Sequence, residues 1–170
     1  MRRTTLKKIT FGTVAVMIAL ALSQTSVIAQ EDEGLERSVE GVWEVTTTPR
    51  NCTTGAPIPA AAFQAIFTFH KDGTMSVWAQ NATITTTRST SFGLWKRERG
   101  WSDYSFKFVH LRYNLSTGAF IGKQEAIGSL TLSDSGDEFT TDSITVIYDA
   151  SGNPGASSCA NSIATRFKLD

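Results

Sequence analysis

The chain has 170 residues, with 16 basic and 16 acidic side chains, 13 glycines, 10 phenylalanines, two histidines and two cysteines. This length is enough for one domain with a sizeable core but not for two. The charge balance excludes a basic nucleic-acid-binding surface, because contacts with phosphate groups require clustered Lys and Arg.

Residues 1–29 have the three parts of a secretory signal peptide. An apolar stretch over residues 9–22 precedes the small-residue pattern Val27-Ile28-Ala29 and follows four basic residues, Arg2, Arg3, Lys7 and Lys8. The alternative is a retained membrane anchor, but this run is shorter than the roughly 20 residues that span a bilayer. We therefore expect cleavage and a secreted or periplasmic protein. Cleavage removes the four basic residues of the leader and leaves the mature chain with four more acidic than basic groups. This excess argues against anionic membranes and nucleic acid as partners.

The mature chain is predicted to begin with an acidic linker, residues 30–40, followed by one barrel domain over residues 41–170. From Gly41 onward apolar and polar residues alternate, the pattern of half-buried antiparallel strands. Turn residues such as Asp72-Gly73 separate the runs. The pattern predicts eight strands, at residues 41–48, 63–70, 74–80, 91–97, 103–114, 119–132, 138–148 and 160–168.

Eight sequential strands with one long connection, between the first and the second, predict an all-β fold: a single eight-stranded up-and-down antiparallel barrel. A two-sheet sandwich has the same alternation, but a Greek-key sandwich requires a long crossover late in the chain. Closure also removes the edge strands that a monomer would otherwise have to protect. The threonine-rich residues 81–91 are predicted to form a mobile connection at the barrel rim.

Two cysteines remain in a chain that is expected to leave the reducing cytoplasm, Cys52 and Cys159. An even number in an exported protein favours a disulfide. The chain-entropy model gives a bond closing about 100 residues a stabilisation of ~4 to 5 kcal/mol. The alternative is two separate buried thiols.

The first predicted strand opens with Gly41-Val42-Trp43, and the last carries Arg166 in "ATRFKL". This combination resembles the lipocalin-like secreted barrels of bacteria, within the wider calycin superfamily. The resemblance implies that Trp43 plugs the closed end of the barrel and that Arg166 lies across its ring, a favourable cation–π contact. A second Gly-x-Trp, at residues 93–95, reflects either an internal duplication or chance, and in both cases Trp95 is expected to be structural.

The inward faces of the predicted strands combine aromatic residues with small ones, which leaves space for a ligand. We expect an apolar molecule to lie against five aromatic rings, with a polar group near one of three polar side chains. These candidate ligand-binding residues are Phe67, Phe69, Phe106, Phe108, Phe120, His110, Arg112 and Gln124. Alternatively the three polar groups sit in water at the rim or satisfy one another. His110 as a haem ligand is a further alternative, but no second coordinating motif accompanies it.

The sequence predicts no catalytic residue, metal site or cofactor, because no nucleophile has a recognisable partner and acidic residues cluster only in turns. It favours a secreted barrel that binds a small apolar molecule over catalysis, which usually requires an acid–base pair in two different environments. A cofactor-free cyclase or isomerase and a filled-core structural or interaction barrel are the alternatives. Both binding and catalysis require a cavity, expected to be at least about 300 Å³. The oligomeric state stays open.

Overall fold

A computed structural model of the chain describes residues 38–79 and 86–169. The predicted leader and residues 30–37 of the predicted linker lie outside the described residues. Within the described ranges, no helix has the length and apolar character needed to cross a membrane. The elements are β1 Gly41–Arg50, the short 3₁₀ helix η1 Pro59–Ala61, β2 Phe63–Phe69, β3 Thr74–Ala79, β4 Thr86–Arg88, β5 Ser91–Arg97, β6 Asp103–Asn114, β7 Phe120–Leu132, β8 Glu138–Tyr148 and β9 Pro154–Arg166.

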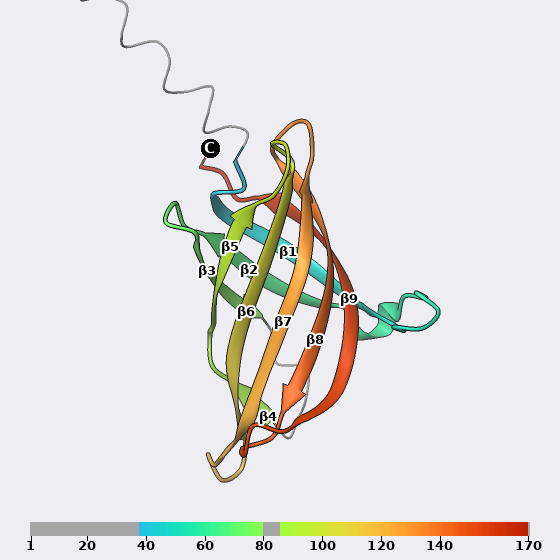
Figure 1. The fold of residues 1–170 in the computed structure, drawn as a ribbon, viewed down its shortest axis with the longest axis vertical. Helices are drawn as coiled ribbons and strands as arrows, with labels where there is room; N and C mark the ends of the chain where they lie inside the picture. Colours follow the sequence, from blue (N-terminus) through green and yellow to red (C-terminus); the bar gives the residue numbers. More distant parts are fainter. Residues whose placement is uncertain (1–37, 80–85, 170) are drawn as a thin grey trace, which may run out of the picture. The chain divides into compact units, whose positions relative to one another are not determined.

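Eight of these strands form a closed antiparallel barrel in the order β1-β2-β3-β5-β6-β7-β8-β9 (Figure 1). The last strand pairs with the first, so Glu44 has Ile66 of β2 on one side and Thr165 of β9 on the other. This arrangement confirms the predicted up-and-down barrel and excludes the sandwich. Every barrel strand pairs with its neighbours antiparallel, as the hairpin-like turn signals predicted.

The strand register shows how strongly the strands are staggered. Cα partners followed once around the barrel from Gly41 reach Ser158 on β9, next to Cys159, the partner of Arg50. The circuit therefore returns to β1 ten residues beyond its start. The eight-stranded core of a TIM barrel has a shear of 8 and is filled by its own side chains. A larger shear at equal strand number widens the barrel, which helps to explain the internal space described below.

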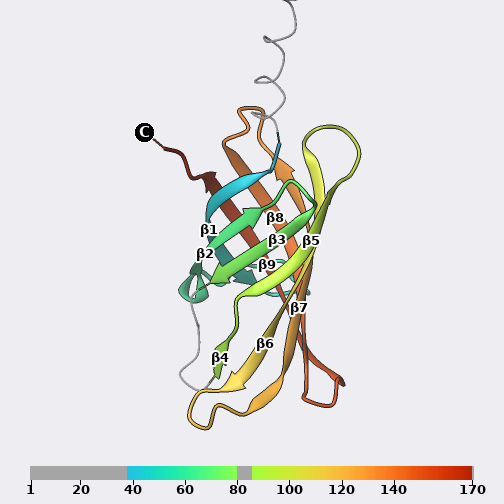
Figure 2. The ribbon, with the colours of Figure 1, turned by 90° about the vertical axis from the view of Figure 1, so that its left-hand side faces the viewer.

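The short strand β4 was not predicted: residues Thr86–Arg88 of the predicted rim connection form a strand. β4 pairs with the end of β6 and continues the line of β5 (Figure 2). Between the pairs Arg88↔Arg112 and Phe92↔Val109, the β4–β5 side has one residue more than β6, which is a β-bulge. The run lacks apolar alternation, so its β-branched threonines were the only strand signal. Residues 81–85 lie outside the described residues.

One end of the barrel is closed by a packed group of large side chains. The rings of Trp43 and Phe139 lie 4.7 Å apart, and Phe69 contacts Phe139 at 6.0 Å, centroid to centroid. Val39, which belongs to the predicted linker, is fully buried there and accepts a hydrogen bond from the indole N–H of Trp43. These side chains are part of the hydrophobic core at this end of the barrel.

Trp43 and Arg166 are in contact, as predicted, with the guanidinium carbon 4.2 Å from the indole centroid. Arg166 also donates hydrogen bonds to the carbonyl oxygens of Ser38, Glu40 and Gly136. Gly41 has φ +123°, and a Cβ there would lie 3.1 Å from the Arg166 guanidinium. This close approach under the arginine explains the glycine at the start of the first strand.

The second Gly-x-Trp is structural too. The Trp95 indole N–H donates to the carbonyl oxygen of His70, and the ring packs edge-on against Phe69. A Cβ on Gly93 would lie 2.1 Å from the carbonyl oxygen of Lys107 on β6. Glycine therefore allows β5 and β6 to come close beside this tryptophan. His70 itself is exposed, as predicted.

Candidate ligand-binding site

The half of the barrel away from the closed end contains a cavity of about 110 Å³ that is partly open to solvent. Thr47 and Pro49 line it from the end of β1, beyond Trp43. This volume is well below the roughly 300 Å³ that we expected from the sequence for binding or catalysis, so that expectation is wrong, and a drug-sized ligand does not fit. The space therefore admits only a small molecule.

One wall of the cavity is aromatic. Phe106 and Phe108 of β6 stack with their centroids 5.9 Å apart, and Phe67 of β2 meets both rings edge-on. Ala65 and Ala126 also line the cavity and take up little of it. The predicted combination of large and small inward residues is thus present, and it creates the space.

The opposite wall carries hydroxyl groups, which sequence reasoning missed. Thr47 and Ser162 share a buried hydrogen bond of 3.0 Å, and Ser143 donates to the carbonyl oxygen of Ala160. Their inward position follows the strand alternation, but Ser and Thr gave no apolar signal that would have marked them. The hydroxyl-bearing lining residues come from β1, β8 and β9 and are Thr47, Thr141, Ser143, Thr145, Ser158 and Ser162.

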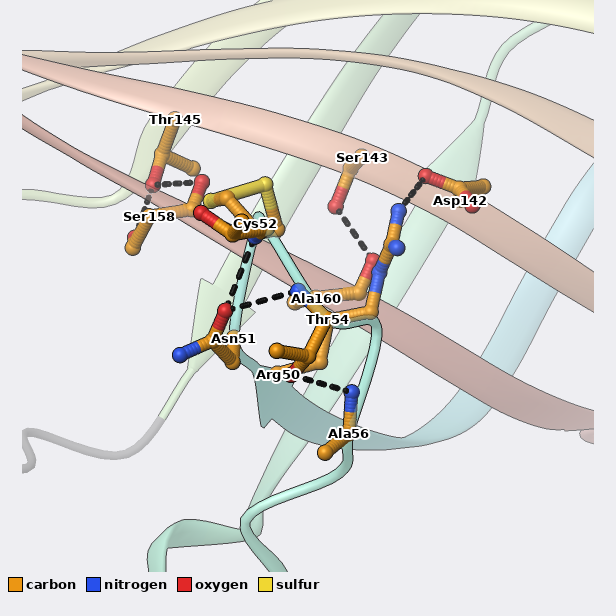
Figure 3. The surroundings of a disulfide bond; sticks show 12 residues. Arg50, Asn51, Cys52, Thr54, Ala56, Asp142, Ser143, Thr145, Ser158 and Ala160 are labelled. Atoms are coloured by element: carbon orange, nitrogen blue, oxygen red, sulfur yellow. Dashed lines mark hydrogen bonds and ion pairs between the residues drawn. A yellow bond between two sulfur atoms is a disulfide. The ribbon is translucent and has the colours of Figure 1, made fainter.

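Cys52 and Cys159 form the predicted disulfide, with a Cα–Cα distance of 5.2 Å (Figure 3). It ties the long β1–β2 connection to β9 at the cavity wall, because Cys159 is itself a lining residue. The amide oxygen of Asn51 accepts hydrogen bonds from the backbone N–H groups of Thr53 and Thr54, which holds the turn after β1. The disulfide therefore fixes one edge of the site.

His110 and Gln124 are cross-strand partners on β6 and β7, and both line the cavity. His110 is 3% exposed, and its Nδ1 lies 3.4 Å from the hydroxyl oxygen of Ser91. Burial, together with the charges of Arg88 and Arg112, lowers the pKa of His110 to about 4, while a hydrogen bond with Gln124 opposes this shift. At neutral pH the imidazole is therefore uncharged and can both donate and accept a hydrogen bond.

Arg88 also lines the cavity, and it was not identified as a site residue from the sequence. Its Nε donates to the carbonyl oxygen of Ala79 at 3.3 Å, and its Nη2 is buried without a hydrogen-bond partner among the described residues. It is the only charged side chain of the described lining at neutral pH. Burial lowers its pKa from the ordinary value, but a guanidinium remains protonated. No sequence signal marked it, because it lies just before the bulge in a run predicted as loop.

The structure brings together five of the eight predicted ligand-binding residues. Phe69 belongs instead to the closed-end core, and Arg112 lies on the inward face of β6 but outside the cavity lining. The inward placement of Phe120 was wrong, because its side chain is 47% exposed and packs on Tyr113. A bulge opposite Arg112–Tyr113 shifts the β7 register, and a one-residue shift turns a side chain to the other face. The five lining residues are Phe67, Phe106, Phe108, His110 and Gln124.

Within residues 38–79 and 86–169 no group of three or more His, Cys, Asp or Glu side chains is placed to hold a metal ion. What the site offers is an apolar ring surface facing hydroxyl groups, with a neutral imidazole, an amide and one cation at the polar end. These groups can bind and orient a small amphipathic molecule. No protein-family model matches the chain, and no curated protein matches it either.

Proposed function

We propose that the protein is an extracytoplasmic barrel that binds a small, largely apolar molecule. The observation that carries the proposal is the cavity of about 110 Å³ between an aromatic wall and a hydroxyl-bearing wall. Burying the Arg88 cation and the His110 imidazole costs free energy unless these groups gain partners. In a barrel with a purely structural core nothing would offset this cost, whereas a bound ligand would.

The volume sets the size of the ligand. An apolar cavity of about 150 Å³ accommodates one benzene molecule. The cavity here is smaller, about 110 Å³, but it is partly open, so part of a bound molecule can extend out of it. We therefore infer a ligand with a single ring or a short branched chain in the cavity and its polar group toward the open end, near His110 and Gln124.

The compartment and the family are part of the same proposal. The secretory pattern of residues 1–29 and the Cys52–Cys159 disulfide both support an oxidising, extracytoplasmic location. The closure by Trp43 and Arg166 supports membership of the lipocalin-like, calycin-type barrels.

Native mass spectrometry of the protein purified from its own host tests the proposal. We expect a low-mass compound that leaves on denaturation. Ala126→Leu, which adds bulk inside the cavity, should abolish its retention. Ser129→Leu adds the same bulk on the exposed outer face of β7 and should retain it. A wild-type protein that carries no compound, and that binds no small aromatic or aliphatic probe by ligand-observed NMR, would overturn the proposal.

A further inference from the structure

Arg88, at the polar end of the cavity, has a second arginine beside it, which lies outside the lining. Arg88 of β4 and Arg112 of β6 are direct partners in the antiparallel ladder. Side chains of directly opposed residues lie on the same face of a sheet, and like charges in such a pair destabilise it. Both arginines act on His110, whose imidazole is uncharged at neutral pH. The fold therefore concentrates positive charge where the cavity opens.

Within residues 38–79 and 86–169 no carboxylate forms an ion pair with either arginine. The described lining of the cavity contains no Asp or Glu, and residues 80–85, which precede β4, contain none in the sequence. The nearest acidic group on β7, Glu125, points to the other face, where it pairs with Lys107 and Lys123. Asp142 of β8 pairs with Arg50. Arg88 and Arg112 thus have no acidic partner in the part of the chain that the structure describes.

We infer that the missing counter-charge belongs to the ligand, and that the ligand is a small carboxylate with an apolar body. Arg88 holds the carboxylate with its free Nη2, and Arg112 adds a second positive charge from the strand opposite. This inference rests on the proposed function and specifies its ligand class. The planar guanidinium matches a carboxylate, with which it can form two parallel hydrogen bonds.

The remaining lining fits the other parts of such a ligand. The stacked rings of Phe106 and Phe108 offer an apolar surface of single-ring size. His110 and Gln124 offer hydrogen bonds beside Arg88 without adding a negative charge that would repel an anion. A neutral ligand would leave the cation of Arg88 without a counter-charge in a partly desolvated site, which is unfavourable.

Benzoate and benzamide form a matched pair of probes, because they have nearly the same shape and differ in charge. We expect titration calorimetry at neutral pH and low salt to show benzoate binding about tenfold or more tightly than benzamide. In Arg88→Gln the two affinities should become equal, and in Arg112→Gln the preference should shrink. Arg99→Gln removes the same charge from an exposed turn residue and should keep the full preference.

Two further readouts separate a ligand-binding arginine from a structural one. Arg88→Gln should keep a urea midpoint close to that of the wild type, because the lost hydrogen bond to Ala79 is offset by the removal of one of two opposed like charges. Benzoate should also move the ring NMR signals of His110 and leave those of the exposed His70 in place. A large loss of stability in Arg88→Gln, or His110 ring signals that do not move with benzoate, would contradict the assignment.

The inference is overturned if benzamide binds as tightly as benzoate, and likewise if hexanoate and hexanamide, used as a second pair, show no preference for the acid. If the acids show no preference but the neutral compounds bind, and Ala126→Leu abolishes that binding, only the inference fails and the proposed function stands. The proposed function fails only if neutral and anionic probes all fail to bind and no compound is retained.

Discussion

Trp43 and Arg166 are direct partners in the ladder between the first and the last strand, and their side chains stack across it at 4.2 Å. Arg166 also donates hydrogen bonds to the carbonyl oxygens of Ser38 and Glu40, just before β1, and to that of Gly136, much later in the sequence. One side chain therefore joins the entry of the chain, the β7–β8 turn and β9. These contacts hold the closed end of the barrel together, and the cavity lies in the other half.

Replacing Arg166 with alanine should lower the free energy of unfolding by about 2 to 4 kcal/mol. The substitution removes the cation–π contact and leaves buried carbonyl groups without donors. Urea denaturation followed by Trp fluorescence measures the loss. Lys168→Ala removes a nearby exposed cation that pairs with Asp137 and should change stability by less than about 0.5 kcal/mol. Equal losses in the two variants would contradict this role of Arg166.

The double variant Cys52→Ala, Cys159→Ala should lose about 4 to 5 kcal/mol of stability in the chain-entropy model. The bond links residues 107 positions apart, so its loss frees most of the unfolded chain. Urea denaturation of both proteins, with and without reductant, measures the effect. Reductant should bring the wild type down to the level of the variant and leave the variant unchanged. A wild type that is indifferent to reductant would speak against this stabilisation.

Gly93→Ala should destabilise the barrel by about 3 kcal/mol or more, because the new methyl group meets main-chain atoms that cannot move aside. A Cβ there would lie 2.1 Å from the Lys107 oxygen and 2.6 Å from the Phe108 Cα. The thermal midpoint by circular dichroism reports the change. Gly155→Ala is the matched control, since its Cβ would meet only the Ile147 oxygen, at 3.5 Å. If both variants melt alike, the close approach of β5 and β6 at this point is wrong.

The stability of the protein should fall as the pH drops from about 6.5 to about 4, in part because of His110. Its pKa is about 4 in the folded protein and 6.5 in the ordinary state, so the unfolded chain takes up the proton first. The contribution is fully present above about pH 6.5 and is lost by about pH 4, with no further change below. We expect a loss of about 1 to 3 kcal/mol from this group.

Urea denaturation of the wild type and His110→Gln at pH 7, 5.5 and 4 isolates that contribution. The carboxyl groups titrate in both proteins, so the difference between the two acid slopes belongs to the imidazole. His110→Gln should lose less stability than the wild type over this interval. Parallel slopes would show that His110 is no harder to protonate in the folded protein than in the unfolded chain.

Much of the fold could be predicted because its signals are local. The predicted bounds of β5, β6 and β8 agree with the structure at both ends, since each combines clear alternation with turn residues on either side. The start of β9 was placed at Ala160 instead of Pro154, because its first residues are small and polar and resemble the preceding turn. β4 was missed for a similar reason, because its residues show no apolar alternation.

The candidate site was predictable only in part. Alternation placed Phe106, Phe108 and His110 on one inward face, because that face is set by the strand itself. Phe120 failed because a bulge, which no residue pattern announced, turned it outward. Arg88 was missed for a related reason, since its place opposite Arg112 depends on the bulge between β4 and β5.

The sequence by itself determined the barrel, because strand order and the alternation of side chains are local properties. The even number of cysteines favoured the Cys52–Cys159 disulfide, and the resemblance to lipocalin-like barrels implied the contact between Trp43 and Arg166. Only the tertiary structure decided the volume of the cavity and which polar side chains lie next to one another in it. The volume depends on the stagger of all eight strands, and a shift of one residue in any pairing would change it. The charge at its mouth depends on two residues 24 positions apart, Arg88 and Arg112, that meet across a ladder whose register is set by side-chain packing elsewhere in the barrel.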